Sequence, residues 1–304
     1  SLEFRAGRLS GFVNEWKKLT SDVFILNMVQ GAEIPITDTG DFSDISSSIN
    51  QVQGNQTQNM DSELQKLLKI GVIEESVSEP GEVISPVFLV KKSDGSHRMI
   101  LNLKKFNENV AYEHFKMENL STATQMVTEG CFMASVDLRH AYYSVPVKPP
   151  FRKYLKFKWK GRLYQYTCFA NGLSNCPRYF TKLLKPVYAH LRSKGYLSTA
   201  FIDDCYLQGQ TYEECAKNVQ ETVKLFQSLG FVIHSEKSVL SPCKKLKYLG
   251  FWLNSDSMTV TLPDDKKEKI RNVCLDLKKK KNVPIRQLAQ AIGQLVAAFP
   301  AVLW

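Results

Sequence analysis

The sequence predicts an α+β fold in which helices back an antiparallel sheet. Short apolar runs rich in strand-forming residues occur at 132–137 and around 201–207, and longer segments with helical spacing lie between and after them. Turn residues such as Gly, Pro, Asn and Asp separate these segments. The order along the chain is strand, strand, helix, a pair of strands, helix, strand, which suits a layer of helices packed on an antiparallel sheet.

Composition bounds the class of protein. A chain of 304 residues, 43% of them hydrophobic, is long enough for a large core and predicts two or three subdomains. The net charge is +10 and the pI is near 9.1, a balance expected of a protein that neutralises phosphates but shared by many soluble proteins. The seven cysteines and five histidines show no zinc-ligand spacing, so we interpret the cysteines as reduced thiols in an intracellular protein.

The sequence gives no sign of a membrane segment. It contains no signal peptide and no apolar stretch of eighteen residues, so we expect no membrane partner. It does not begin with Met, and it ends in the apolar run Leu295–Trp304. An exposed apolar end is a poor natural terminus, which predicts that the chain is a segment of a larger polyprotein.

The N-terminal third alternates helices with polar segments. Residues 8–30 have helical spacing, and residues 37–59 are polar with little periodicity, which predicts a linker or loop. A short helix over 61–70 is expected to end at Gly71. Residues 83–103 predict a hairpin that turns at Ser93–Ser96.

The middle of the chain predicts strands around a long helix. Asp137 ends the strand at 132–137, and Gly161 turns the next strand, 151–160, into a strand at 163–167. In 151–160 the alternation predicts one face of Phe151, Leu155, Phe157 and Trp159 and an opposite face of Arg152, Tyr154, Lys156, Lys158 and Lys160. A helix over 175–194 follows, and Pro186 is expected to bend or split it.

The C-terminal third predicts a helix, strands and two further helices. The Thr211–Glu214 capping box begins a helix that reaches Gly230, and residues 231–254 return to strands. Helices are expected at 264–281 and 284–298. We expect the second to pack part of an apolar stripe on the first, and Phe299–Trp304 to find no partner within the chain.

Three carboxylates carry the chemistry. Asp203-Asp204 interrupts an apolar run at 201–207, and Asp137 ends a second apolar strand. Neighbouring carboxylates repel, and a pair of divalent metal ions held by three of them has the geometry used for phosphoryl transfer. Asp264-Asp265, by contrast, has the context of a helix start. An exposed hairpin turn at Asp203-Asp204 stays possible, but in a basic chain the constellation points to a nucleic-acid polymerase.

Residues 60–300 resemble a reverse transcriptase of the fingers, palm and thumb type, with the right-hand polymerase fold. Five segments match family motifs in order, namely Phe132–Val147, Phe169–Pro177, Phe201–Asp204, Gly230–Ser238 and Tyr248–Phe251. The resemblance divides the chain into an N-terminal helical extension and polar linker (1–59), fingers and palm (60–245), and a primer-grip hairpin with a helical thumb (246–304). Leu249–Ser255 and the run from Gly172 to Lys182 are most similar to retrotransposons of the DIRS group.

The resemblance implies roles for the acidic and basic residues. Asp137, Asp203 and Asp204 are expected to bind two Mg²⁺ ions, with Mn²⁺ as a substitute. Lys237 matches a lysine proposed to protonate the leaving pyrophosphate, or it is a surface lysine beside Glu236. The lysines at Lys278–Lys281 have two interpretations: they contact nucleic-acid phosphates as part of a thumb, or they form the solvated end of a helix.

The resemblance also implies a pocket for the nucleotide. Its residues are Lys92, Arg98, Leu138, His140, Ala141, Tyr142, Asn171 and Gly172, and Leu249 and Gly250 grip the primer. Lys91 competes with Lys92 for the phosphate. Tyr142 would exclude a 2′-hydroxyl, unless it is a core residue. Ala170 and Cys176 replace a Pro and an Ala of the family pattern, which puts the rigidity of that loop in doubt.

The resemblance therefore predicts a retrotransposon RNA-directed DNA polymerase that extends a nucleic-acid primer with dNTPs on an RNA or DNA template. It also predicts a ribonuclease H domain downstream in the same polyprotein and an intracellular location. Two alternatives stay open, a non-catalytic nucleic-acid-binding remnant and an RNA-dependent RNA polymerase. The intact aspartates argue against the first, and Tyr142 argues against the second.

Overall fold

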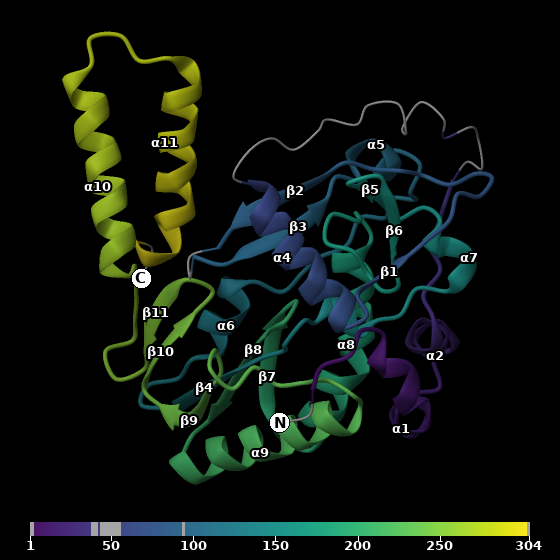
Figure 1. The fold of residues 1–304 in the computed structure, drawn as a ribbon. Helices are drawn as coiled ribbons and strands as arrows, with labels where there is room; N and C mark the ends of the chain where they lie inside the picture. Colours follow the sequence, from purple (N-terminus) through teal and green to yellow (C-terminus); the bar gives the residue numbers. More distant parts are fainter. Residues whose placement is uncertain (1–2, 38–41, 43–55, 93–94, 303–304) are drawn as a thin grey trace. The chain divides into compact units, whose positions relative to one another are not determined.

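A computed structural model describes residues 3–37, 42, 56–92 and 95–302 (Figure 1). The chain forms two units, each built from three segments of sequence. The first unit comprises residues 1–117, 138–190 and 224–232, and the second comprises residues 118–137, 191–223 and 233–304. Most of the predicted linker at 37–59, part of the turn at 93–96 and the last two residues lie outside the described part of the chain.

A four-stranded antiparallel sheet forms the centre of the second unit. Its order is β7-β8-β4-β9, so that β4 and β8 are internal strands. The strands are β4 (Phe132–Asp137), β7 (Leu197–Phe201), β8 (Asp204–Gly209) and β9 (Val239–Cys243). Asn218, on α9 (Tyr212–Ser228), donates its Nδ2 to the carbonyl oxygens of Leu197 and Gln208 at 2.8 and 3.0 Å, which ties this helix to β7 and β8.

A smaller sheet of order β10-β11-β12 completes the core of the second unit. Its strands are β10 (Lys245–Tyr248), β11 (Phe251–Asn254) and β12 (Thr259–Thr261). One apolar cluster joins this sheet to α6 (Leu120–Met126) and to Met133 and Tyr206 of the larger sheet. One face of β4 and β8 is therefore buried up to the point where the strands reach Asp137 and Asp204.

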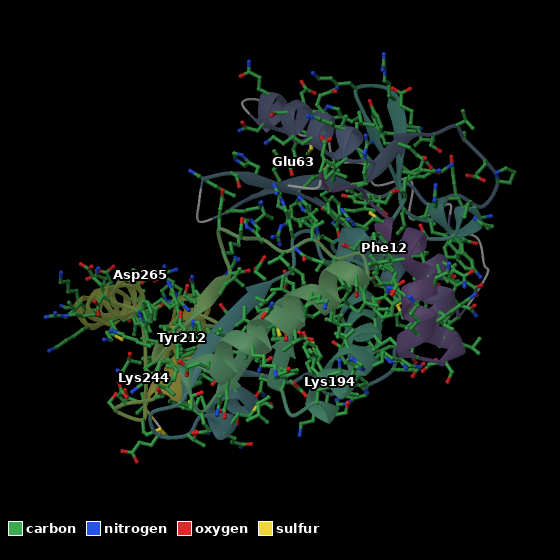
Figure 2. All side chains as sticks on the ribbon, turned by 90° about the horizontal axis from the view of Figure 1, so that it is seen from below. Phe12, Glu63, Lys194, Tyr212, Lys244 and Asp265 are labelled. Atoms are coloured by element: carbon green, nitrogen blue, oxygen red, sulfur yellow. The ribbon has the colours of Figure 1, made fainter. Side chains whose placement is uncertain are left out.

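Two helices follow these strands and lie side by side (Figure 1). They are α10 (Asp264–Lys279) and α11 (Ile285–Ala298), and the short helix η3 (Phe299–Ala301) comes after them. Figure 2 labels Asp265, which lies at the start of α10. The predicted apolar stripe of α11 remains largely exposed, with Ile285 87% and Ile292 50% accessible. Phe299 and Val302 are also exposed, as expected, whereas Ala301 packs on the apolar cluster.

The first unit contains a three-stranded sheet, a two-stranded hairpin and several helices. The sheet has the order β1-β6-β5, and β2 pairs with β3. The strands of the first unit are β1 (Ile73–Glu75), β2 (Val87–Lys91), β3 (His97–Leu101), β5 (Lys156–Trp159) and β6 (Arg162–Tyr166). Its helices are α4 (Gln56–Lys69), α5 (Lys104–Asn107), α7 (Pro149–Arg152) and most of α8 (Cys176–Ser193).

The N-terminal extension is part of the core of the first unit. The predicted helix over 8–30 is wrong as a single element, because the chain forms η1 (Arg8–Phe12), α1 (Val13–Leu19) and α2 (Val23–Gln30). The break falls where Asp22 caps α2 by accepting hydrogen bonds from the backbone N–H groups of Phe24 and Ile25. Trp16 is fully buried and donates its indole N–H to the Leu229 carbonyl oxygen at 2.9 Å.

The predicted strand at 151–160 is partly wrong. Pro149 and Pro150 begin the helix α7, so the strand starts only at Lys156. Lys156 was expected on the polar face, but its side chain is completely buried. Its ammonium group lies 2.8 Å from Glu79, 2.8 Å from Glu82 and 2.7 Å from the Val77 carbonyl oxygen. A loop that is distant in sequence therefore covers the face that simple alternation assigned to solvent.

The predictions for Gly71 and Pro186 had different outcomes. The helix before Gly71 is confirmed, since α4 ends at Lys69 and Gly71 has a φ of 75°. Pro186 does not split its helix, because α8 runs from Cys176 to Ser193 through it. Leu183, Leu184 and Val187 around the proline are buried, and this packing offsets the hydrogen bond that proline cannot make. Of the helices in the described part of the chain, none is long and apolar enough to cross a bilayer.

Replacing the buried Lys156 should destabilise the protein. In Lys156→Ala the carboxylate of Glu82, which is only 13% exposed, loses its cation, and we expect a loss of about 3 kcal/mol of unfolding free energy. Lys158→Ala removes an exposed cation from the same strand and should change stability by less than about 0.5 kcal/mol. Urea denaturation measures both, and equal losses in the two variants would contradict the assigned role of Lys156.

Candidate active site

Strand register brings Asp137 and Asp204 together at the end of the larger sheet. Asp137 is the last residue of β4, Asp204 is the first of β8, and the two are direct cross-strand partners. Directly opposed residues point to the same face of a sheet with their Cβ atoms about 4.5–5.5 Å apart. Two carboxylates that are 67 positions apart in the sequence thus share one small, partly buried site.

Asp203 lies in the turn that joins β7 to β8. Phe201 pairs with Asp204, so the connection is a two-residue turn of Ile202 and Asp203. Ile202 has a φ of 56°, in the left-handed region that β-branched residues avoid at a cost of roughly 1–2 kcal/mol. The strained turn begins β8 at Asp204 and thereby keeps the third carboxylate next to the other two.

Hydrogen bonds fix the backbone on both sides of the carboxylates. The Asp137 N–H donates to Ser238 Oγ at 2.9 Å, and the Asp137 carbonyl oxygen accepts from the His234 N–H at 2.9 Å. Ser238 Oγ also donates to the His234 carbonyl oxygen, which closes this small network. Tyr248 donates its hydroxyl to the Asp204 carbonyl oxygen at 3.1 Å. The 234–238 turn and the β10–β11 hairpin therefore hold the two strand ends.

Electrostatics within the site favour a neutral or cation-bound Asp204. Burial and the charges of Asp203 and Asp137 together raise the pKa of Asp204 to about 6, against the opposing effect of Lys237. A hydrogen bond with the Asp137 side chain also raises it. Lys237 is thus close enough to act on these carboxylates. At neutral pH the site contains repelling negative charges that a cation would relieve.

The donor set suits a hard divalent cation. All three side chains offer carboxylate oxygens, the ligands that Mg²⁺ prefers, and burial together with their mutual repulsion raises the pKa of Asp204. In the described part of the chain, no group of three or more His, Cys, Asp or Glu side chains is arranged so that it could hold a metal ion. The fit to Mg²⁺ therefore rests on the ligand type of the three carboxylates and on their positions at one end of the sheet.

The β2–β3 hairpin distinguishes between the two candidate lysines. Val90 lies opposite Arg98 and Lys91 opposite His97, and the Lys92 N–H donates to the Ser96 carbonyl oxygen at 2.8 Å, one step further along the ladder. Side chains alternate along a strand, so Lys92 shares the face of Val90 and Arg98, and Lys91 does not. Arg98 is exposed on that face, which favours Lys92 as its partner.

The residues after Asp137 are closely packed in the first unit. Leu138 and Ala141 are buried, and the partly buried Tyr142 places its ring edge-on to Phe180 with 5.5 Å between centroids. His140 has a φ of 53° and an exposed side chain, whose ring lies 4.8 Å from that of Phe4. Tyr142 therefore has both accessible surface and a rigid backing.

The loop at Asn171 and Gly172 is held against β3. A Cβ at Gly172, whose φ is 112°, would lie 2.4 Å from the Leu101 carbonyl oxygen, so only glycine fits there. Asn107 donates its Nδ2 to the Gly172 carbonyl oxygen at 2.9 Å and accepts from the Ser174 N–H at 3.0 Å. Asn171 donates its Nδ2 to the Tyr143 hydroxyl at 2.8 Å.

Leu249 and Gly250 form the two-residue turn between β10 and β11. Both have positive φ values, 47° and 80°, as expected for a tight hairpin turn. Lys266, near the start of α10, donates its Nζ to the Gly250 carbonyl oxygen at 3.0 Å. The hairpin thus connects the first of the two C-terminal helices to the strand whose Tyr248 contacts Asp204.

Comparison with known proteins identifies the family. The model of the family described as "Reverse transcriptase (RNA-dependent DNA polymerase)" matches residues 90–253, more than half of the chain. The chain belongs to the reverse transcriptase family. The family consists of enzymes that act as RNA-directed DNA polymerases.

Two polyproteins are similar to this reverse transcriptase domain. The Pro-Pol polyprotein of Simian foamy virus type 1 is 23% identical over 207 residues, which cover 68% of this chain and 17% of that protein. The Transposon Tf2-3 polyprotein of Schizosaccharomyces pombe is 20% identical over 202 residues, 66% of this chain and 15% of that protein. The chain thus spans less than a fifth of the length of these curated relatives.

Solved structures show the fold. The foamy viral protease-reverse transcriptase in complex with dsDNA matches with a TM-score of 0.72 at 18% identity, covering 98% of this chain and 64% of that one. The same viral enzyme with an RNA/DNA hybrid matches with a TM-score of 0.67 at 18% identity, covering 97% of this chain and 41% of that one. The fold is the right-hand polymerase fold with antiparallel sheets, as the sequence predicted.

Reasoning from the sequence of this reverse transcriptase domain missed several supporting residues. Ser238 lies within a matched motif, but it contacts the backbone of Asp137, which is about 100 residues earlier in the chain. Asn107 and Tyr143 belong to no polar motif of the sequence. Asn107 contacts Gly172, 65 residues away, and Tyr143 contacts Asn171, 28 residues away. The residue type is the one sequence signal for the role of Asn107, because Asn side chains often hydrogen-bond to backbone groups in turns.

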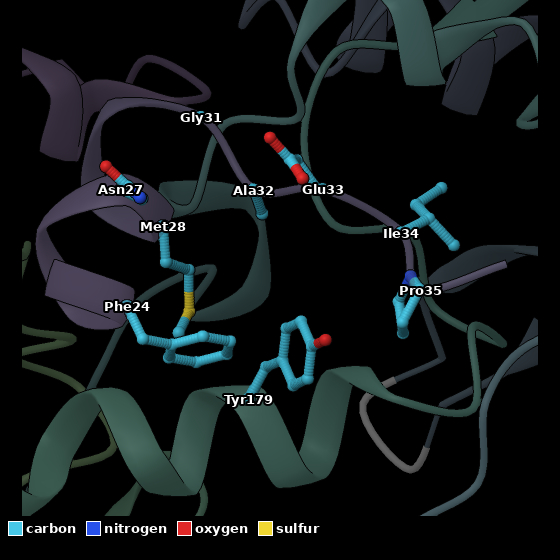
Figure 3. Close-up of a pocket in the computed structure, with 9 residues that line it drawn as sticks. All are labelled: Phe24, Asn27, Met28, Gly31, Ala32, Glu33, Ile34, Pro35 and Tyr179. Atoms are coloured by element: carbon cyan, nitrogen blue, oxygen red, sulfur yellow. The ribbon is translucent and has the colours of Figure 1, made fainter.

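A cavity of about 190 Å³ lies in the first unit between α2, residues 31–35 and α8 (Figure 3). Phe24 and Met28 of α2 face Tyr179 of α8 across it, and Asn27 and Glu33 add polar atoms. None of the predicted catalytic or nucleotide-binding residues lines this cavity. It belongs to the packing of the N-terminal extension rather than to the candidate active site.

The raised pKa of Asp204 predicts a pH-dependent stability. The folded protein binds a proton at Asp204 up to about pH 6, whereas the unfolded chain releases it near pH 4, so wild-type stability falls as pH rises through this window. Asp204→Asn removes the titration. We expect the variant to gain about 2 kcal/mol relative to wild type between pH 4 and 6.5 without added divalent ions. Urea denaturation across this range measures the difference, and a constant difference would contradict the assignment.

Proposed function

We propose that the chain is the polymerase domain of a retrotransposon reverse transcriptase that adds dNTPs to a primer 3′-hydroxyl on an RNA or DNA template. The cross-strand pair of Asp137 and Asp204, with Asp203 in the adjoining strained turn, is the observation that carries the proposal. Carboxylates that repel each other cost stability, so a protein that no longer used them in catalysis would become more stable if they were replaced. Membership of the family supplies the reaction class.

In the proposed mechanism the three aspartates would supply oxygen ligands for two Mg²⁺ ions, or for Mn²⁺ in their place. The chemistry supplied by the bound ions is activation of the attacking hydroxyl and stabilisation of the leaving charge. Lys237, which already lowers the pKa of Asp204, donates a proton to the departing pyrophosphate. The elevated pKa of Asp204 means that cation binding displaces a proton below about pH 6.

The nucleotide is bound by residues of the first unit. Lys92 and Arg98, on one face of the β2–β3 hairpin, neutralise the triphosphate. Leu138, His140 and Ala141 line the path to the sugar, and the Tyr142 ring excludes a 2′-hydroxyl because Phe180 holds it edge-on. Asn171 and Gly172 bind the nucleotide and position the template, and Leu249 and Gly250 hold the primer end.

The wider setting is proposed from sequence motifs and from relatives. The polyproteins of foamy virus and of the Tf2 transposon support an origin in a longer polyprotein. We assign the domain to the DIRS group from its Leu249–Ser255 and Gly172–Lys182 segments, with a ribonuclease H downstream and an intracellular location. We retain the division into an extension (1–59), fingers and palm (60–245), and primer grip and thumb (246–304).

A non-catalytic nucleic-acid-binding remnant is the second candidate, because the basic charge alone would support binding. An RNA-dependent RNA polymerase is a third candidate, and the aromatic Tyr142 disfavours it. Catalysis and sugar selection distinguish the three candidates.

Primer extension tests the proposed function. The protein should extend oligo(dT) on poly(rA) with dTTP and Mg²⁺, and Asp203→Asn should lower the rate by at least about 100-fold because a ligand charge is lost. Asp265→Asn changes an exposed aspartate at the start of α10 and should extend normally. Binding of the duplex without extension by the wild type would instead support the remnant.

Sugar selection tests the role of Tyr142. Tyr142→Val should raise the efficiency of rNTP incorporation relative to dNTP by at least about tenfold, because the ring no longer meets the 2′-hydroxyl. The ratio of kcat/KM values for rTTP and dTTP measures this change. An active variant with the wild-type ratio would assign Tyr142 to packing, and preferred rNTP use by the wild type would favour the RNA polymerase.

A further inference from the structure

Tyr143 is buried next to the proposed sugar gate, and the proposed mechanism does not use it. The residue is only 7% exposed, and its hydroxyl accepts a hydrogen bond from Asn171 Nδ2 at 2.8 Å. A buried phenol of this size packs equally well as phenylalanine, so the hydroxyl is the part of the side chain that requires an explanation. Its partner Asn171 is one of the residues that we propose to bind the nucleotide.

The Tyr143 ring is rigidly placed from several directions. The ring stacks on His140 with 5.7 Å between centroids and an interplanar angle of 23°, and His140 in turn contacts Phe4. The Tyr143 carbonyl oxygen accepts from the Gly7 N–H at 2.7 Å, so the N-terminal extension holds its backbone. Burial raises the pKa of the phenol, which keeps the hydroxyl protonated at any physiological pH.

The backbone around Asn171 is equally constrained. Gly172 lies against the Leu101 carbonyl oxygen, and Asn107 holds both the Gly172 carbonyl oxygen and the Ser174 N–H. The remaining freedom of Asn171 is the rotation of its own side chain. A hydrogen bond to a fixed buried hydroxyl selects one rotamer before any ligand binds, and such preorganisation lowers the entropic cost of binding.

We propose that Tyr143 is a positioning residue for nucleotide binding, whose hydroxyl holds the Asn171 amide in the conformation that meets the incoming dNTP. This inference rests on the proposed polymerase function. It adds that the N-terminal extension contributes to the nucleotide pocket, because residues 4–7 fix the tyrosine through its ring neighbour and its backbone. Tyr143 itself touches neither the substrate nor the reacting atoms.

A double-mutant cycle tests the proposal on the whole 304-residue chain. Tyr143→Phe should raise the KM for dTTP about 3- to 10-fold, the value of one neutral hydrogen bond, and should change kcat by less than about twofold. Asn171→Ala should raise KM at least as much, and the double variant should match Asn171→Ala because the hydroxyl acts only through the amide. An unchanged KM in Tyr143→Phe, or additive effects in the double variant, would overturn the proposal.

The chain offers a matched control. Tyr166 is fully buried in β6, close enough to influence Tyr143, and within the described part of the chain its hydroxyl has no hydrogen-bond partner. Tyr166→Phe therefore removes the same atom from the same core and should leave KM unchanged. A rise equal to that of Tyr143→Phe would attribute the effect to general loosening of the core and overturn the positioning role.

A spectroscopic readout separates this inference from the proposed function. The Asn171 side-chain amide resonance is identified in ¹⁵N-labelled protein by its absence in Asn171→Ala. Tyr143→Phe should shift this resonance, and Tyr166→Phe should not. If the wild type fails to extend primers but the shift occurs, the hydrogen bond is confirmed and the polymerase proposal is wrong. The role of Tyr143 in nucleotide binding is then wrong as well, because it rests on that proposal. If extension occurs and the resonance does not move, the positioning role of Tyr143 is wrong.

Discussion

The cross-strand pairing of Asp137 with Asp204 is the constraint on which the candidate active site depends. Side chains alternate along strands, so a slip of one residue between β4 and β8 would send the two carboxylates to opposite faces of the sheet. The register is secured by the apolar side chains on the same strands, among them Met133 and Tyr206, which are buried in the cluster under the β10–β12 sheet. Apolar burial thus places two charges together that would separate if left to themselves.

The surroundings of this pair offset its repulsion without removing it. Ser238, His234 and Tyr248 bond to the backbone of the aspartates and so hold the strand ends. Lys237 is the group that acts on the charge, because it lowers the pKa of Asp204. The turn at Ile202 also positions an aspartate without stabilising its charge, because it places Asp203 at a cost in backbone strain. A site of this kind is stable only because the rest of the unit is well packed.

The sequence predicted the parts of this arrangement that depend on local pattern. The strand ending in Asp137 and the end of α4 at Gly71 follow from periodicity and turn chemistry. The turn between β7 and β8 is Ile202-Asp203, with Asp204 beginning β8, whereas the sequence offered a turn at Asp203-Asp204 only as an alternative. The errors arose where distant segments decide the outcome. Lys156 is buried because the loop at 77–82 folds over it. The break near Asp22 has a local cause by contrast, because the Asp22 side chain caps α2. Tyr143 was given no role from the sequence, since no pattern in one sequence indicates which amide a phenol will meet.

The order in which the strands of the larger sheet occur along the chain affects how the protein reaches its native state. The central strand β4 pairs with β8 on one side and with β9 on the other, and Met133 meets Cys243 in the second pairing. During synthesis one edge of β4 therefore stays open until more than 100 further residues have emerged, and the first unit also waits for residues 224–232. Such non-local pairing slows folding and exposes an apolar strand edge. The nascent domain should consequently be most vulnerable to aggregation and proteolysis before β9 is made.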